Sequence, residues 1–315
     1  MHLSFTKVYF GIGGGGMKEN LRAEYNTIGF CEGKVKENNI IYFLHKHAKL
    51  FPQKIALEWV TKKTLQSWDG IAELRTESIT YKDFADKLNA ISSGLKKIGI
   101  AKGDRVIIFV PLSIELYLSM FAVQRLGGIA VFLDSWARKD HLGVCAQVVK
   151  PKAMISFEKA FDLCSAVPEL ANIQIRVVVG PHERGYTSDL ESLIRNSETS
   201  DIEPVRSNDT ALITFTTGSS GVPKGADRTH RFLAAQHRAL DRVIPYNESD
   251  RDLPVFPIFS LNNLAGGVTT VLPAIDLAAP SDKDAAIIVN QIRLGKVTCC
   301  TISPSIFVNI AEYCH

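Results

Sequence analysis

Residues 210–225 read Thr-Ala-Leu-Ile-Thr-Phe-Thr-Thr-Gly-Ser-Ser-Gly-Val-Pro-Lys-Gly, an apolar run followed by small residues and one lysine. The apolar residues 211–215 predict a buried strand that leads directly into a loop. Glycines at 218, 221 and 225 allow the backbone to point successive N–H groups toward one anion. We therefore expect a phosphate-binding loop at the carboxyl end of this strand.

The side chains of the loop are also suited to phosphate, because hydroxyl groups donate hydrogen bonds and Lys224 carries a positive charge. The residues predicted to bind the nucleotide are Thr216, Thr217, Gly218, Ser219, Ser220, Gly221 and Lys224. A plain polar surface loop is the alternative, but it would need neither Pro223 nor an apolar lead-in strand. A P-loop is disfavoured, since that motif places Ser or Thr directly after the lysine and Gly225 stands there.

The segment from Phe215 to Gly225 resembles the signature of the adenylate-forming superfamily: acyl-CoA synthetases, nonribosomal peptide adenylation domains and luciferases. That signature is a hydrophobic or aromatic residue, Thr-Ser-Gly-Ser/Thr-Thr-Gly, one variable residue and Pro-Lys-Gly. The chain differs from it by conservative replacements only. Further resemblances lie at residues 78–84, 100–109 and 121–134, so the similarity covers nearly the whole chain from about Glu37.

The resemblance also implies an acid-binding wall. Family members carry Pro-x-Phe-His beside the carboxylate substrate, and residues 257–260 read Pro-Ile-Phe-Ser, which predicts a roomier pocket. The residues predicted to face the acid are His237, Phe256, Phe259, Ser260, Asn262 and Asn263. The two asparagines could instead cap a following helix. His230 and Arg228 are expected to be packing or surface residues.

The implied activity is ATP-dependent conversion of a carboxylic acid to acyl-AMP with release of pyrophosphate, followed by transfer to CoA. Residues 252–261 and 271–277 resemble the branch of long-chain acyl-CoA synthetases and olefin β-lactone synthetases, which favours a fatty or β-hydroxy fatty acid. A β-lactone-forming synthetase, transfer to a carrier thiol and a non-catalytic nucleotide-binding module are the alternatives. Mg²⁺ is expected with ATP, but the sequence assigns no metal ligand and no catalytic residue.

The fold class expected is α/β, with multilayered βαβ subdomains and mainly parallel sheets, because helical and strand patterns alternate from Tyr81 onward. We expect a flexible extension at 1–36, a first subdomain at 37–200 and the start of a second at 201–315. By this resemblance we expect the family's C-terminal domain, which carries a catalytic lysine, to be absent from this chain, and we expect this chain alone to be inactive. The helices are expected at 81–98, 113–126, 141–149, 229–243, 283–294 and 304–313, and the strands at 105–110, 129–133, 153–155, 175–179, 211–215, 252–255 and 267–272.

Composition is that of a soluble globular protein, with 46% hydrophobic and 22% charged residues. The net charge of +3 is too small to indicate a nucleic-acid partner, and no run reaches the length of about 18 apolar residues that a membrane-spanning helix requires. Cysteines at 31, 145, 164, 299, 300 and 314 form no Cys-x-x-Cys motif, which predicts reduced thiols and a cytoplasmic location. The sequence leaves open a homodimer.

Overall fold

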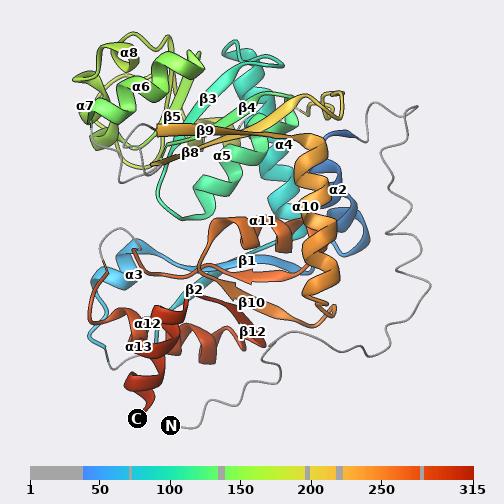
Figure 1. The fold of residues 1–315 in the computed structure, drawn as a ribbon, viewed down its shortest axis with the longest axis vertical. Helices are drawn as coiled ribbons and strands as arrows, with labels where there is room; N and C mark the ends of the chain where they lie inside the picture. Colours follow the sequence, from blue (N-terminus) through green and yellow to red (C-terminus); the bar gives the residue numbers. More distant parts are fainter. Residues whose placement is uncertain (1–37, 71–72, 134–138, 196–198, 218–222, 277–279) are drawn as a thin grey trace. The chain divides into compact units, whose positions relative to one another are not determined.

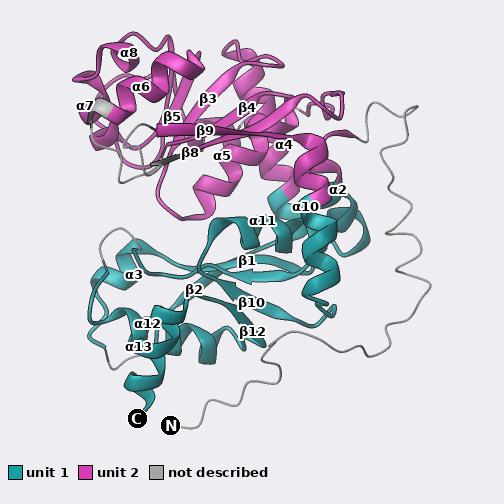
Figure 2. Ribbon diagram, in the orientation of Figure 1, with its two compact units in different colours: residues 1–17, 43–84, 236–315 teal, residues 18–42, 85–235 magenta. Residues whose placement is uncertain are grey.

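The computed structural model describes residues 38–70, 73–133, 139–195, 199–217, 223–276 and 280–315 (Figure 1). The extension predicted for residues 1–36 lies outside these ranges. The described chain forms two compact units, with residues 43–84 and 236–315 in unit 1 and residues 38–42 and 85–235 in unit 2 (Figure 2). Both units are discontinuous in sequence, and the division expected at residue 200 stays a prediction.

Unit 2 is built on a seven-stranded sheet. Its strands are β3 (Arg105–Phe109), β4 (Ile129–Phe132), β5 (Ala153–Ser156), β6 (Ile175–Val178), β7 (Ser188–Asp189), β8 (Thr210–Thr217) and β9 (Pro223–Thr229). Their order is β7-β6-β5-β3-β4-β8-β9, and every neighbouring pair is parallel except β8 and β9. The strand predicted at 211–215 is therefore β8, with a hydrogen-bonded neighbour on each side.

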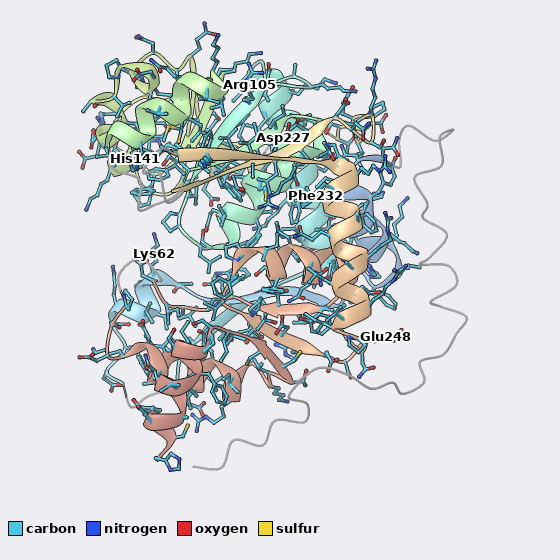
Figure 3. The ribbon with its side chains drawn as sticks, in the orientation of Figure 1. Lys62, Arg105, His141, Asp227, Phe232 and Glu248 are labelled. Carbon is cyan, nitrogen blue, oxygen red and sulfur yellow. The ribbon has the colours of Figure 1, made fainter. Side chains whose placement is uncertain are left out.

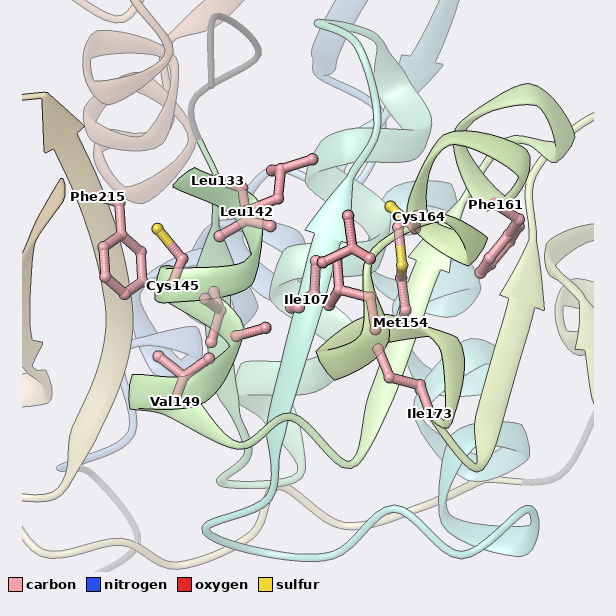
Figure 4. Packing of buried hydrophobic residues seen from close by; sticks show 14 of the residues in the cluster. Ile107, Leu133, Leu142, Cys145, Val149, Met154, Phe161, Cys164, Ile173 and Phe215 are labelled. Atoms are coloured by element: carbon pink, nitrogen blue, oxygen red, sulfur yellow. The ribbon is translucent and has the colours of Figure 1, made fainter. Parts of the chain in front are cut away.

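Helices cover both faces of this sheet. They are α4 (Tyr81–Lys97), α5 (Ile114–Arg125), α6 (Lys139–Val149), α7 (Glu158–Ser165), α8 (Pro168–Ala171) and α9 (Leu190–Arg195). On one face Ile107 of β3 packs with residues of α6 and α7 in a cluster that also contains Phe215 (Figure 4). Val106 and Ile108 point to the opposite face, because side chains alternate along a strand, and both are buried.

Unit 1 contains a five-stranded sheet. Its strands are β1 (Ile55–Val60), β2 (Thr76–Thr80), β10 (Arg251–Pro254), β11 (Thr269–Val271) and β12 (Cys299–Thr301), in the order β12-β10-β11-β1-β2. Only β1 and β2 pair antiparallel. Within this unit the sheet lies between α11 on one face and α12 with α13 on the other (Figure 1). The remaining helices of the described chain are α2 (Ile41–Leu50), α3 (Lys62–Gln66), α10 (His230–Val243), α11 (Pro257–Gly266), α12 (Asp284–Leu294) and α13 (Pro304–Cys314).

Alternation along β10 explains this arrangement. Leu253 joins a buried apolar cluster with Ile288 of α12 and Ile310 of α13. Its neighbour Asp252 points to the other face and reaches Asn263 of α11. One face of β10 is therefore held by apolar packing and the other by a polar contact.

The predicted fold class is confirmed, and each predicted helix and strand is present with ends shifted by two residues or fewer. Local signals set the limits of α4, for example. Thr80 accepts from the Asp83 N–H at 3.1 Å as its N-cap, and Gly99 beyond its end has a φ of 102°. Cys145, Cys164, Cys299, Cys300 and Cys314 are free thiols, as predicted, and Cys31 lies outside the described residues.

Candidate functional site

Strands β8 and β9 form an antiparallel hairpin in unit 2, and residues 218–222 join their ends. Thr216 is the cross-strand partner of Lys224, and Thr217 is the partner of Pro223. The loop expected directly after residue 215 does not begin there: β8 continues to Thr217, and Pro223 to Gly225 belong to β9. This strand was missed because Pro and Gly usually interrupt strands; at the sheet edge, however, Pro223 gives up no essential hydrogen bond.

Phe215 and Gly225 face one another across the hairpin. The Phe215 ring is buried, and a Cβ added at Gly225 would approach its Cε1 atom to 3.1 Å. Farther along, Thr210 Oγ1 donates to Asp227 Oδ2 at 3.0 Å, and Asp227 is labelled in Figure 3. Glycine at 225 thus leaves room for the ring that anchors the hairpin to the core of unit 2.

The predicted phosphate-binding residues are distributed along this hairpin. Thr216 and Thr217 end β8, and Lys224, the second residue of β9, is solvent-exposed. The predicted ligands Gly218, Ser219, Ser220 and Gly221 lie outside the described residues. The register brings the lysine and Thr216 to adjacent backbone positions beside residues 218–222.

The predicted acid-facing residues lie on or beside α11 in unit 1. Phe256 is the N-cap residue of α11 and is 41% exposed, and Pro257 follows as the first helical residue. Phe259 is partly buried, whereas the Ser260 side chain is fully enclosed and its Oγ has no partner among the described residues. The helix ends at Gly267, whose φ of 74° suits glycine.

Asn262 and Asn263 do not cap a following helix, which corrects that alternative. Both lie inside α11 and are buried, because the helix continues to Gly266. Asn262 Oδ1 lies 2.7 Å from Nδ1 of His237, a buried residue of α10. Burial lowers the pKa of His237, and the bond to Asn262 opposes that shift. The bond to Asn262 thus joins His237 to α11, and the Phe43 ring lies next to His237, with ring centroids 5.0 Å apart.

Two buried or partly buried side chains that were not assigned from the sequence, Asp252 and Tyr246, lie beside Asn263. Asp252 on β10 accepts from Asn263 Nδ2 at 2.8 Å and from Tyr246 Oη at 2.9 Å. Burial raises the pKa of Asp252 to about 6. The sequence carried only a weak signal, since Asp252 directly precedes the apolar run of residues 253–255.

His230 belongs to packing, as expected. It is fully buried at the start of α10, and its Nδ1 accepts from the Ile40 N–H at 3.1 Å. Burial lowers the pKa of His230 to about 4. Arg228 lies over the Phe232 ring, 5.5 Å from its centroid, so this arginine also makes a local contact on the protein surface.

Comparison with known proteins agrees with the hairpin signature. Residues 44–315 match the family described as AMP-binding enzyme. The chain belongs to this family. Among curated AMP-binding relatives, it is 28% identical over 278 residues to the olefin beta-lactone synthetase of Stenotrophomonas maltophilia, covering 87% of this chain and 50% of that protein. It is 30% identical over 241 residues to the olefin beta-lactone synthetase of Xanthomonas campestris pv. campestris, covering 75% and 43%.

Solved structures show the same fold. A long-chain-fatty-acid-CoA ligase from Archaeoglobus fulgidus superimposes with a TM-score of 0.71 at 18% identity, covering 85% of this chain and 52% of that one. At this identity the likeness concerns the fold alone. This AMP-binding chain spans about half the length of the curated relatives it matches, 50% and 43% in the two named.

Among the described residues, no helix is long and apolar enough to cross a membrane. No group of three or more His, Cys, Asp or Glu side chains in the same part of the chain is arranged to hold a metal ion.

Proposed function

We propose that this chain is the nucleotide- and acid-binding part of an enzyme that converts a carboxylic acid to acyl-AMP with release of pyrophosphate. The β8–β9 hairpin carries this proposal. Its register places Lys224 opposite Thr216 at the base of a Gly- and Ser-rich connection, in a chain of the AMP-binding family. A positive charge beside hydroxyl and backbone N–H donors is the chemistry that a polyphosphate requires.

In this proposal the hairpin holds the β- and γ-phosphates and performs no covalent step. A carboxylate oxygen of the acid attacks the α-phosphorus of ATP, the new P–O bond forms, and the bond to pyrophosphate breaks. Attacking and leaving groups are both anionic oxygens, so positioning and charge neutralisation govern the rate. Thr216, Thr217, Gly218, Ser219, Ser220, Gly221 and Lys224 are the proposed nucleotide ligands.

The acid is assigned to α11 and its neighbours. The residues proposed to face it are His237, Phe256, Phe259, Ser260, Asn262 and Asn263. A fatty or β-hydroxy fatty acid is favoured, because an exposed Phe256 and a partly buried Phe259 flank the start of an apolar helix. Mg²⁺ is proposed to accompany ATP, with no ligand assigned in this chain, and CoA is the proposed acceptor of the acyl group.

A β-lactone-forming synthetase is the second candidate. It is favoured by the two named relatives, both olefin beta-lactone synthetases at 28% and 30% identity. In that reaction the β-hydroxyl oxygen of the activated acid would attack its own acyl carbon and AMP would leave. Product analysis with a β-hydroxy acid separates the candidates, since the lactone forms without CoA. A cytoplasmic location and a homodimer stay predictions.

Calorimetric titration of the 315-residue chain with ATP tests the nucleotide site. Lys224→Ala should weaken binding by about 1.5–3 kcal/mol, the typical value of a hydrogen bond to a charged group. Lys159→Ala is the matched control, because Lys159 is an exposed lysine of α7 in the same unit. Equal affinities for all three proteins would overturn the assignment of the hairpin.

Pyrophosphate release with a fatty acid tests for chemistry. This chain alone should show none at an appreciable rate, because no residue in it is assigned as magnesium ligand, ribose ligand or catalytic lysine. ATP binding without release would fit the present proposal and also a non-catalytic module. A longer polypeptide, in which this chain is extended to the length of its relatives, separates these two, since only the enzyme then releases pyrophosphate.

A further inference from the structure

A buried polar contact joins α11 to the strand that precedes it. Asp252 on β10 and Asn263 on α11 are both fully buried. Asn263 Nδ2 donates to Asp252 Oδ2 at 2.8 Å, and Tyr246 Oη donates to the same oxygen at 2.9 Å. The chain leaves the sheet after residue 254, forms α11 and returns to residue 252 through this contact.

Asn263 also holds the carboxyl end of the helix through its backbone. Its carbonyl oxygen accepts from the Val268 N–H at 2.9 Å and lies 3.3 Å from Tyr81 Oη. The Gly267 N–H donates to the same carbonyl as the C-cap of α11. Within unit 1, a single residue therefore connects α11 to the sheet, to its own terminal turn and to Tyr81.

We propose that Asp252 and Asn263 are positioning residues that form a clasp, closing the segment 252–263 and setting where the acid-facing side chains of α11 lie. The inference rests on the proposed function, because that function assigns Phe256, Phe259, Ser260 and Asn262 to the acid. All four lie inside the closed segment.

The surroundings explain why a polar clasp has this effect. Thr270 of β11 pairs with Asp252 of β10 in the sheet. Three buried oxygens here have no hydrogen-bond partner among the described residues: Thr270 Oγ1, Asp252 Oδ1 and Ser260 Oγ. Apolar contacts alone would let α11 slide, because hydrophobic attraction has no direction, whereas a hydrogen bond is directional. Breaking the clasp would leave further buried polar atoms unsatisfied, so α11 would move away from the sheet.

Hydrogen–deuterium exchange of the 315-residue chain tests the clasp directly. Asp252→Leu and Asn263→Leu should each accelerate exchange of the amides of residues 257–267 by at least about tenfold, since local opening controls their exchange. The exchanged pair Asp252→Asn with Asn263→Asp should restore slow exchange, because amide and carboxylate still face one another. Ile288→Ala is the control: it creates a cavity at α12 in the same unit and should leave exchange in 257–267 unchanged.

Ligand affinity separates positioning from stability. Asp252→Leu should weaken the binding of a long-chain acyl sulfamoyl adenosine, a non-hydrolysable acyl-AMP analogue, by at least about tenfold. It should weaken the binding of AMP by less than about twofold. The exchanged pair should recover the analogue's affinity, and Ile288→Ala should keep the wild-type ratio of the two affinities.

The two proposals fail in different ways. If the wild-type chain binds neither ligand, the proposed function fails, while the exchange experiment still judges the clasp. The clasp is wrong if Asp252→Leu leaves hydrogen–deuterium exchange of residues 257–267 unchanged. It is also wrong if the double variant Asp252→Asn with Asn263→Asp exchanges fast, whatever the ligand affinities are.

Discussion

Gly267 at the end of α11 lies directly against the ring of His47 on α2. A Cβ added at Gly267 would overlap His47 Nδ1 and come within 2.8 Å of its Cε1. The backbone at Gly267 also has a φ of 74°, a conformation that side chains disfavour. The turn after α11 therefore excludes every residue but glycine, for two independent reasons.

Gly267→Ala should consequently lower the free energy of unfolding by about 2–4 kcal/mol, from backbone strain and from overpacking. Gly103→Ala is the matched control, because Gly103 has a φ of 80° and nothing within 4 Å of an added Cβ. Urea denaturation of both variants measures the difference. Equal losses would show that His47 moves aside and that strain alone disfavours a side chain at Gly267.

The buried His47 ring predicts a pH dependence of stability. Burial, assisted by the charge of Lys46 and by His237, lowers the pKa of His47 from 6.5 to about 4. Between these values the unfolded chain binds a proton that the folded chain does not, so stability is fully present above pH 6.5 and is lost as the pH falls toward 4. The full effect is about 3 kcal/mol.

Denaturation curves at pH 7.5, 5.5 and 4.5 measure this loss. His47→Gln should reduce the loss by about 3 kcal/mol, because glutamine does not titrate, while His230, whose pKa is also about 4, keeps its own contribution. His182→Gln is the control, since His182 is exposed in unit 2 and should leave the dependence unchanged. If His47→Gln has the wild-type slope, the ring is accessible to protons in the folded protein.

Local sequence patterns predicted those elements of this fold that need only their own residues. The α4 helix follows from apolar side chains at Phe84, Leu88, Ile91 and Leu95, all buried as the spacing of three and four requires. The β8 strand follows likewise from the apolar run before the glycines. Strand β9 could not be found this way, since Pro223 and Gly225 form a strand only through pairing with β8.

The candidate site was predicted in part for the same reason. The motif around Lys224 is local, so its place after strand β8 could be foreseen, whereas the pairing of Lys224 with Thr216 in a hairpin could not. Asn263 was interpreted as a possible cap because its partner Asp252 becomes its neighbour only once α11 folds back over the sheet. His47 gave no signal at all, since its role depends on a glycine 220 residues farther along the chain.

Asp252→Asn should change the pH dependence of stability in the direction opposite to His47→Gln. The folded protein holds the Asp252 carboxyl with a pKa of about 6, raised from 3.8 by burial. Between these values the folded chain binds the extra proton, so this group makes the protein more stable as the pH falls. Asp252→Asn lacks this gain in stability at low pH, because asparagine does not titrate.

Relative to Asp252→Asn, wild type should therefore gain up to about 3 kcal/mol between pH 7.5 and pH 3.5. The amide can still accept from Asn263 and Tyr246, so the clasp should persist and isolate the titration. Asp284→Asn is not a suitable control, because Asp284 Oδ2 accepts the Ser281 N–H at the start of α12. Asp241→Asn, a partly buried site on α10, serves instead. A constant difference between wild type and Asp252→Asn across this range would mean that Asp252 titrates normally.

Ser260→Ala should raise the free energy of unfolding by about 1 kcal/mol, because it removes a buried hydroxyl that has no hydrogen-bond partner among the described residues. Ser92→Ala is the matched control. Ser92 is equally buried, but its Oγ donates to the Leu88 carbonyl at 2.7 Å, so its loss should destabilise by a similar amount. Thermal and urea unfolding of the two variants should shift in opposite directions.

A gain in stability at Ser260 has a functional meaning. Proteins retain unsatisfied polar groups where activity requires them, so a hydroxyl that costs stability is expected to serve the bound acid. Ser260→Ala should then bind the acyl-AMP analogue more weakly than wild type, while AMP affinity stays the same. If the variant is more stable and binds both ligands as wild type does, Ser260 does not contact the acid; if it is less stable, the hydroxyl has a partner in the folded protein.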